Sequence, residues 1–291
     1  MPSAQDFRRI RTALRFVQLP TLGNIYFADS VAGSSTGGYV PEAGTATLIQ
    51  AQTLCTASNG DVVYVSPGHA ESVIAAAGMT FDKAGIIYQG LGVGRLRPTI
   101  TFSTSTAAQI IISGANITFR NFVFDFTGVS AIVAAISITG ADVAFEDCEF
   151  IISTGTNAPV LGILTAATAA RLRIERCRFL GPATSTDTCT ACIKHEVGVD
   201  YVIRGCYFTG KMTQAILNAT ALLRGLIHSN VFVIATGTLA ISVNAASTPM
   251  ITNNRINVPS GTTPITAAAG FVCGNIYSAA AGVTAGTAST I

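Results

Sequence analysis

Hydrophobic and polar residues alternate in a short unit that recurs along the chain. The clearest copy, residues 141–150, reads Ala-Asp-Val-Ala-Phe-Glu-Asp-Cys-Glu-Phe, and the pattern returns at 170–179 and at 199–208. Apolar residues recur at every second position on each side of a two-residue interruption. Val143 and Phe145 are the apolar positions before it. Alternation with a period of two predicts two short strands joined by a bend, with one face of each strand buried.

Weaker copies before and after these three extend the series to seven units. Each unit closes on an apolar residue, and the closing residues are Phe124, Phe150, Phe179, Phe208, Phe232, Ile256 and Tyr277. Their separations of 26, 29, 29, 24, 24 and 21 residues fall in the range that marks repeat proteins. Without helical segments between them, the strands of successive units can stack in parallel, about 4.8 Å apart. The pattern predicts an all-β fold, a parallel β-helix.

The charged residues test this stacking, because residues in one slot of successive units become neighbours and opposite charges then favour the pairing. Seven neighbouring pairs are opposite in sign, and one pair, Glu146 with Glu175, is alike. The first slot holds Asp142, Arg171, Asp200 and Arg224, the second holds Arg120, Glu146, Glu175 and Arg204, and two further pairs are Asp147 with Arg176 and Glu149 with Arg178. The charge pattern therefore supports the register that the apolar positions predict.

The second position of the bend is expected to point into the core. It holds Phe122, Cys148, Cys177, Cys206, Asn230, Asn254 and Asn275. This column resembles right-handed parallel β-helix proteins, the group that includes pectate lyases and phage tailspikes, in which stacked asparagines form an internal ladder. An inward Asn at a tight bend can bond the local backbone and the next Asn, and a free Cys fits the same buried position. The right-handed sense follows from the resemblance and from the general preference for right-handed crossovers.

The chain ahead of the repeat predicts a strand at 25–28, a short helix within 45–56 and a strand at 61–68. This order resembles the opening of many β-helix proteins. A helix at that place would cover the exposed edge of the first turn, which otherwise invites aggregation.

Two segments, 60–72 and 90–102, together resemble a recurring type of phage-encoded β-helix protein. The resemblance covers about residues 24–277, and it is more specific for fold than for function. It implies a virion protein, and the three-fold packing of phage β-helices implies a homotrimer. An isolated solenoid with few charges would also expose much Ala, Val, Ile and Thr, which favours association.

Composition narrows the classes of partner. Only 11% of the residues are charged, and the net charge of +2 argues against a general attraction to nucleic acid or membranes. No apolar run reaches the 18 residues of a membrane span. Seven cysteines leave at least one unpaired, and no signal peptide is recognisable, so we expect synthesis in a reducing host cytoplasm.

The basic charge is concentrated in residues 1–22, where four arginines against Asp6 give +3, while 13 basic and 14 acidic residues give −1 elsewhere. This segment is either a solvated tail or surface helix, or an arm that docks on an acidic partner surface. The candidate docking residues are Phe7, Arg8, Arg9, Arg11 and Arg15. The expected organisation is a basic N-terminal arm at 1–22, an opening strand and capping helix at 23–60, the β-helix at 61–277 and a small-residue tail at 278–291.

Enzymatic chemistry requires groups that this pattern does not supply. Glycoside hydrolysis needs a carboxyl group with a raised pKa, whereas each repeat carboxylate lies beside an arginine that favours its ionised form. A calcium site of the pectate-lyase type needs an acidic cluster, and no column supplies one. We therefore expect no enzyme activity and no cofactor.

Two small groups of residues remain as candidates for chemistry. Cys189 and Cys192 with His195 match half of a zinc site, but no second ligand pair lies near, and the alternation through His195 also predicts a strand. His69 and Glu71 follow a Pro-Gly turn and are expected to decorate it, with a catalytic role as the alternative. We expect no bound metal.

The leading hypothesis is a non-enzymatic structural protein of a phage virion, above all a capsid decoration or cement protein. Its arm would bind the major capsid protein or another virion protein, with no nucleic-acid or membrane partner. The alternatives are a tail or receptor-binding β-helix with carbohydrate affinity, and a polysaccharide-degrading β-helix enzyme. The long segments at 153–169 and 181–199 are where a solenoid would place a partner surface.

Overall fold

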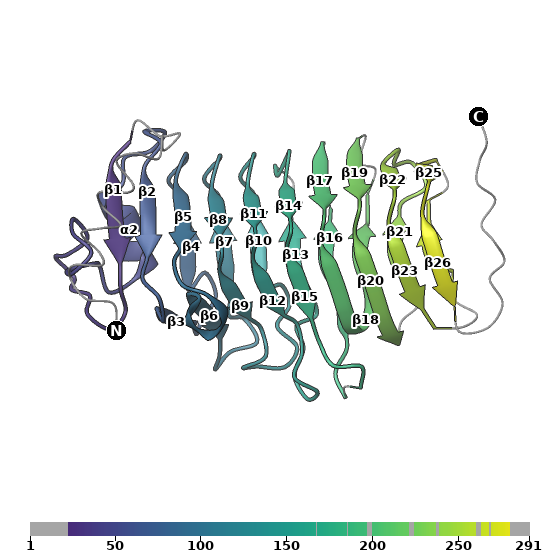
Figure 1. The fold of residues 1–291 in the computed structure, drawn as a ribbon, viewed down its shortest axis with the longest axis horizontal. Helices are drawn as coiled ribbons and strands as arrows, with labels where there is room; N and C mark the ends of the chain where they lie inside the picture. The colour runs from purple at the N-terminus through teal and green to yellow at the C-terminus, as the bar shows by residue number, and fades with distance from the viewer. Residues whose placement is uncertain are drawn as a thin grey trace.

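The computed structural model describes residues 23–166, 168–184, 186–196, 200–220, 224–236, 239–259, 263–267 and 269–279. Over these residues the chain coils into an elongated solenoid in which equivalent strands of successive turns lie side by side (Figure 1). The strand pairs of its sheets are parallel, and there is very little helix. The fold is the all-β parallel β-helix that the sequence predicts.

The first sheet holds one strand from each turn. Its strands in spatial order are β1 (Ile25–Ala28), β2 (Val62–Val65), β5 (Ile87–Gly90), β8 (Thr118–Arg120), β11 (Ala144–Glu146), β14 (Arg173–Glu175), β17 (Tyr201–Arg204), β19 (Gly225–His228), β22 (Met250–Thr252) and β25 (Phe271–Cys273). Because β1 pairs with β2, this sheet begins with the opening strand and not with the strand at 61–68.

The second and third sheets complete each turn, and the long strand β18 (Tyr207–Asn218) belongs to both. The second sheet also holds β3 (Ala70–Val73), β6 (Thr99–Phe102), β9 (Val123–Asp125), β12 (Glu149–Ile151), β15 (Arg178–Leu180), β20 (Val231–Thr236), β23 (Arg255–Val258) and β26 (Ile276–Ala279). The third also holds β4 (Met79–Phe81), β7 (Ile110–Ile112), β10 (Ile136–Ile138), β13 (Leu161–Thr165), β16 (Cys189–His195), β21 (Leu239–Val243) and β24 (Ile265–Thr266). A 3₁₀ turn, η1 (Gly94–Leu96), lies between β5 and β6.

The repeat unit is built as the alternation predicts. In residues 141–150, β11 ends at Glu146 and β12 begins at Glu149, with a two-residue bend between them. Phe150 in β12 lies opposite Phe124 on one side and Phe179 on the other. The register that the apolar and charged positions predict is therefore confirmed.

The bend between the first and second sheets contains a residue in the left-handed backbone region. Its φ angle is +55° at Asp147, +52° at Arg176 and +64° at Gly205. Gly adopts this region without cost and Asp tolerates it, whereas a long side chain such as that of Arg is strained by about 1 kcal/mol or more. The left-handed residue turns the next side chain of the bend, a cysteine in these three turns, into the core.

The inward column forms a hydrogen-bonded ladder in the later turns. Nδ2 of Asn230 donates to Oδ1 of Asn254 at 3.0 Å, and Nδ2 of Asn254 donates to Oδ1 of Asn275 at 2.8 Å. The same two Oδ1 atoms accept the backbone N–H groups of Asn230 and Asn254, each at 2.9 Å. The predicted asparagine ladder is confirmed, and it satisfies polar groups that are buried from water.

Cysteines occupy the same slot in the earlier turns. Cys148, Cys177 and Cys206 are buried and free, and each thiol donates to a backbone carbonyl of the preceding turn at 3.4 Å. Burial raises the pKa of the Cys177 thiol well above its ordinary value. These thiols therefore act as small core residues with weak hydrogen bonds.

A stack of phenylalanine rings runs along the solenoid. The ring centroids of Phe150 and Phe179, and those of Phe179 and Phe208, lie 4.6 Å apart with planes within 10° of parallel. Phe124 and Phe232 continue the stack at 5.1 and 4.8 Å. Stacked rings of this kind bury a large apolar area and hold successive turns in one register.

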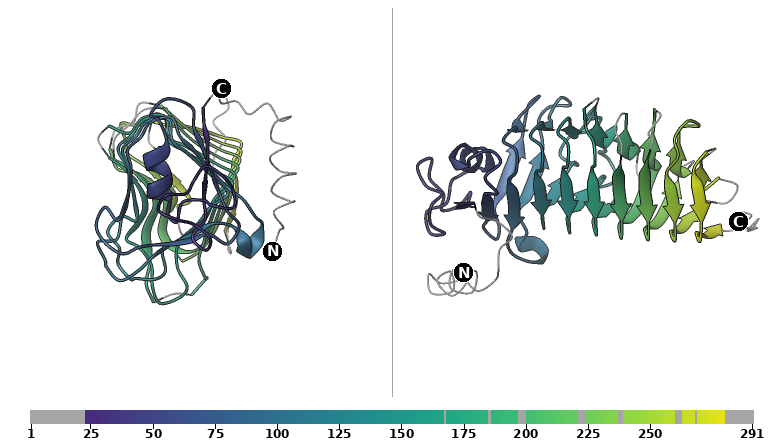
Figure 2. Two further views of the ribbon diagram at one scale, coloured as in Figure 1. Left: turned by 90° about the vertical axis from the view of Figure 1, so that its left-hand side faces the viewer. Right: turned by 90° about the horizontal axis from the view of Figure 1, so that it is seen from above.

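A helix covers the N-terminal end of the solenoid, as the sequence predicts (Figure 2). This helix, α2 (Leu48–Leu54), begins with a capping box between Thr47 and Gln50 and buries Leu48 and Ala51 against the first turns. Among the described residues, no helix is long and apolar enough to cross a membrane.

The third sheet is the part of the fold that the repeat pattern did not reveal. The segments 153–169 and 181–199, interpreted as partner-presenting inserts, contain the third-sheet strands β13 and β16. Only their first parts project as loops, at the lower edge of the solenoid in Figure 1. The alternation through His195 predicts a strand, and β16 confirms it.

Asn254→Ala tests the ladder. Removing the carboxamide breaks its ladder bonds and leaves the buried N–H of Asn230 without its acceptor, so the free energy of unfolding should fall by about 2–4 kcal/mol. Asn257→Ala, at an exposed position of β23, is the matched control and should change it by less than about 0.5 kcal/mol. Equal losses in urea denaturation would contradict the ladder's role.

The three stacked thiols should be inaccessible in the folded protein. Cys148, Cys177 and Cys206 should all titrate with a thiol reagent in denaturant, but should react far more slowly than Cys273 under native conditions, because Cys273 is only partly buried. Mass spectrometry of the modified peptides measures both rates. Fast native labelling of the stacked thiols, or a disulfide between any two of them, would count against the inward column.

Candidate functional site

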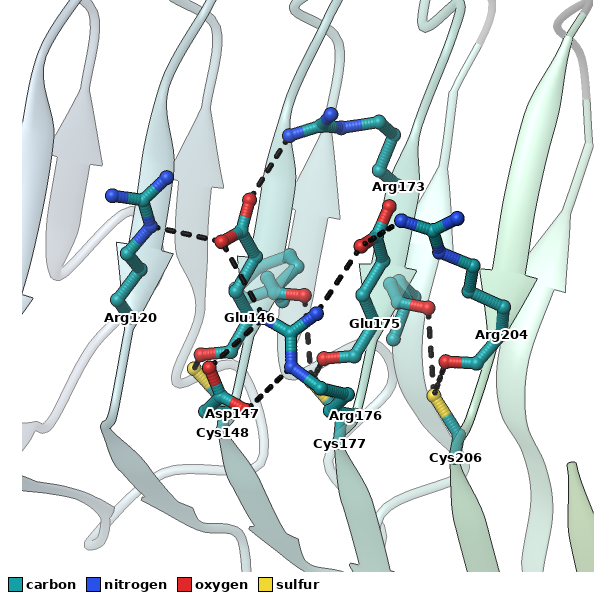
Figure 3. Close-up of polar contacts among 12 residues, drawn as sticks. Arg120, Glu146, Asp147, Cys148, Arg173, Glu175, Arg176, Cys177, Arg204 and Cys206 are labelled. Atoms are coloured by element: carbon teal, nitrogen blue, oxygen red, sulfur yellow. Dashed lines mark hydrogen bonds and ion pairs between the residues drawn. The ribbon is translucent and has the colours of Figure 1, made fainter. Parts of the chain in front are cut away.

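Charged side chains gather on the outer face of the first sheet and on the turns at its two edges. We call this set the charged face, and its central part is drawn in Figure 3. It comprises Arg120, Asp142, Glu146, Asp147, Arg171, Arg173, Glu175, Arg176, Asp200, Arg204 and Arg224. Because each turn adds residues to the same slots, the face is a direct product of the repeat register.

Six of the seven opposite-charge pairs that the sequence predicts are ion pairs. Their shortest N···O distances run from 2.5 to 3.2 Å in the pairs Arg171–Asp142, Arg224–Asp200, Arg176–Asp147, Arg120–Glu146, Arg204–Glu175 and Arg178–Glu149. Arg171 and Arg176 each reach both oxygens of their partner carboxylate. Such bidentate pairs fix the side-chain geometry more tightly than single contacts do.

The repulsion of the one like-charge pair, Glu146 beside Glu175, is offset by two arginines. The pairing of equivalent slots in successive units did not predict these contacts. Nη2 of Arg173 lies 3.0 Å from Oε1 of Glu146. The guanidinium of Arg176 reaches between the two glutamates, 3.7 Å from an oxygen of Glu146 and 3.5 Å from one of Glu175 (Figure 3). Both arginines belong to the 170–179 unit, so the sequence contained the residues that make these contacts. Only the side-chain geometry shows which carboxylates they reach.

Around Glu146 and Glu175, the arginines lie outside the carboxylates. The Glu146 and Glu175 side chains are 11% and 7% exposed, whereas those of Arg173 and Arg204 are 49% and 55% exposed. The outermost layer is therefore rich in guanidinium groups, with the negative charge beneath it. Long arginine stems can cover buried carboxylates while their charged ends stay in water.

Pairing between arginines and aspartates favours the ionised forms of Asp142 and Arg176. Hydrogen bonding from Arg171 lowers the pKa of Asp142, and the bond to Asp147 raises the pKa of Arg176. A carboxylate with a lowered pKa is a poor proton donor at neutral pH. Asp142 is therefore suited to accepting hydrogen bonds and not to general acid catalysis.

A shallow groove of about 500 Å³ lies on one side of the charged face. It crosses the β8, β11, β14 and β17 turns, and its lining residues are Asn116, Thr118, Asp142, Arg171, Arg173, Asp200 and Val202. The groove thus combines guanidinium donors with carboxylate, amide and hydroxyl groups. Arg171 and Asp200, the seventh predicted pair, both line it.

The half zinc pattern, Cys189, Cys192 and His195, lies buried in β16. Cys189 and Cys192 are buried, and Sγ of Cys192 lies 3.6 Å from the sulfur of Met212. His195 stacks on Tyr201 with ring centroids 4.3 Å apart, and burial lowers its pKa to about 3. Nowhere in the described part of the chain do three or more His, Cys, Asp or Glu side chains gather as metal ligands.

His69 and Glu71 do not decorate a turn, because both side chains are almost fully buried. Nε2 of His69 bonds Oε1 of Glu71 at 2.6 Å, and Nδ1 accepts the backbone N–H of Ser30. The same Glu71 oxygen accepts the N–H of Leu48 at the start of α2. The pair therefore joins the opening segment, the helix and β3, which is a structural role.

The candidate docking residues of the arm, Phe7, Arg8, Arg9, Arg11 and Arg15, lie outside the described residues. Their role stays a prediction. The tail is likewise outside beyond Ala279, where β26 ends.

Comparison with known proteins supports the fold and leaves the function open. No protein-family model and no curated protein matches the chain. Pectate lyase Pel9A resembles it with a TM-score of 0.60 at 12% identity, over 84% of this chain and 68% of the lyase. A rhamnogalacturonan lyase has a TM-score of 0.48 at 14% identity over 87% of each chain. The tailspike of E. coli bacteriophage HK620 scores 0.45 at 10% identity, over 98% of this chain and 61% of the tailspike.

Glu146→Gln tests whether the charged face stabilises the fold. This largely buried carboxylate faces three arginines, so neutralising it should lower the free energy of unfolding by about 1–3 kcal/mol. Asp147→Asn, at an exposed neighbouring position whose left-handed backbone suits Asn, should cost less than about 1 kcal/mol. Urea denaturation of both variants measures the difference, and an equal or reversed order would contradict the interpretation.

Proposed function

We propose that this chain is a non-enzymatic structural protein of a phage virion. One observation carries the proposal: every carboxylate of the charged face is held by at least one arginine, as Glu146 is by three. These groups support the solenoid and are poorly placed to transfer protons. The phage assignment rests on the resemblance of residues 60–72 and 90–102 to phage-encoded β-helix proteins.

Within the virion, the proposed role is that of a capsid decoration or cement protein. The solenoid is a homotrimer, and its basic arm at 1–22 binds an acidic surface of the major capsid protein or of another virion protein. Three arms at one end would strengthen a weak contact through multivalency. The protein is made in the host cytoplasm and becomes part of the particle there.

Deleting residues 1–22 tests the attachment. The truncated protein should keep the thermal unfolding midpoint and the trimeric mass of the full chain, but should no longer co-sediment with particles that lack the protein. The full chain serves as the positive control. Co-sedimentation of the truncated protein at full occupancy, or a monomeric mass by light scattering, would show the attachment model to be wrong.

A carbohydrate-binding β-helix is the second candidate, and the groove on the charged face favours it. Sugar hydroxyls need both donors and acceptors, and the groove offers Arg173, Asp142 and Asn116 at its wall. A polysaccharide-degrading enzyme stays a further alternative. Incubation with acidic polysaccharides separates the carbohydrate-binding candidate from the enzyme. Only an enzyme would release new reducing or unsaturated ends, and their release would contradict the non-enzymatic proposal.

A further inference from the structure

The charged face carries one positive charge more than its carboxylates neutralise. It holds six arginines and five carboxylates, a difference of +1. Five of the arginines have a column partner of opposite charge within ion-pair distance. Arg173 is the sixth, and its neighbours in register, Ala144 and Val202, are uncharged.

The guanidinium of Arg173 is only partly engaged. A single bond joins its Nη2 to Oε1 of Glu146, whose other oxygen is taken by Arg120 at 2.9 Å. A guanidinium has five N–H donors, so most of those of Arg173 remain open to a ligand. The half-exposed side chain lines the groove, where it presents a forked donor that fits a carboxylate.

The rest of the groove suits a ligand that is mostly neutral and rich in hydroxyl groups. Asp142 and Asp200 supply acceptors, and Asn116 and Thr118 supply both donors and acceptors. The groove crosses four neighbouring strands, which span roughly 14 Å at the usual spacing. That length accommodates a short stretch of sugar residues.

We propose that this groove binds an acidic polysaccharide, with one sugar carboxylate held by Arg173 and neighbouring hydroxyls held by Asp142 and Asp200. The inference deepens the second candidate function and requires no bond cleavage. It is independent of the N-terminal arm.

Two other polymers fit the groove less well. Duplex DNA carries one negative charge per roughly 1.7 Å of its axis, so it would meet Asp142 and Asp200 with only one uncompensated cation in return. An acidic peptide in extended form usually adds to an exposed sheet edge, whereas this groove lies on a sheet face whose backbone groups pair with both neighbouring strands.

Binding of polygalacturonate that is methyl-esterified on most of its sugars, and is therefore mostly neutral, tests the proposal on the full chain. Fully methyl-esterified polygalacturonate is the uncharged match. The partly esterified polymer should bind at 0.15 M salt, and complete esterification should weaken binding at least tenfold. Arg173→Gln should also weaken it at least tenfold, and Arg173→Lys should recover part of the loss. Arg178→Gln removes a similarly exposed arginine on the second sheet, and should change affinity by less than threefold.

Several results would overturn the proposal. One is equal affinity for the partly and the fully esterified polymer. Another is an Arg173→Gln variant that binds as tightly as the unmodified chain at an unchanged unfolding midpoint. A third is tighter binding of duplex DNA or of a polyglutamate peptide than of the polysaccharide. The protein lacking residues 1–22 should bind polygalacturonate as the full chain does. Loss of particle attachment without loss of glycan binding therefore separates the groove from the arm.

Discussion

A left-handed residue at the same bend of every repeat unit governs this solenoid. This residue lies between the first and second sheets. It turns the chain from one sheet to the other and orients the next side chain into the core. Only a residue that tolerates positive φ, or is held there by other contacts, can occupy the place. Gly205 does so freely, whereas Arg176 is held by its bidentate pair with Asp147. Strain in the backbone and charge on the surface are thus coupled at the same residue.

Once the bend is fixed, residues in the same slot of successive turns become neighbours. The inward and outward columns meet this constraint with different residue types. A buried slot must either lack polar groups or satisfy them. It therefore holds thiols such as Cys177 in the earlier turns and hydrogen-bonded amides such as Asn254 in the later ones. An outer slot must avoid like charges at the strand spacing. Where it fails to do so, at Glu146 and Glu175, arginines from elsewhere in the unit reach across.

The first two sheets could be predicted from the sequence because the apolar positions on each side of the bend recur from unit to unit, and because the second bend position repeats a residue type. The third sheet was harder to predict, since strands such as Leu161–Thr165 bury consecutive residues and follow loops of varying length. The sequence pattern also misplaced His69, whose burial depends on Ser30, a partner 39 residues earlier in the chain. For the charged face, spacing predicted the pairs, but the reach of Arg173 depends on side-chain geometry.

The two ends of the solenoid would respond differently to mechanical load. The N-terminal end is closed by α2, whereas at the other end of the described chain Phe271 and Ile276 are exposed on the last turn. Each turn contacts chiefly the turns beside it. A force applied from the C-terminal side would therefore peel the chain one turn at a time, lengthening it by 21 to 29 residues per step over the repeat. Its extension trace would be a series of similar peaks and not one cooperative rupture.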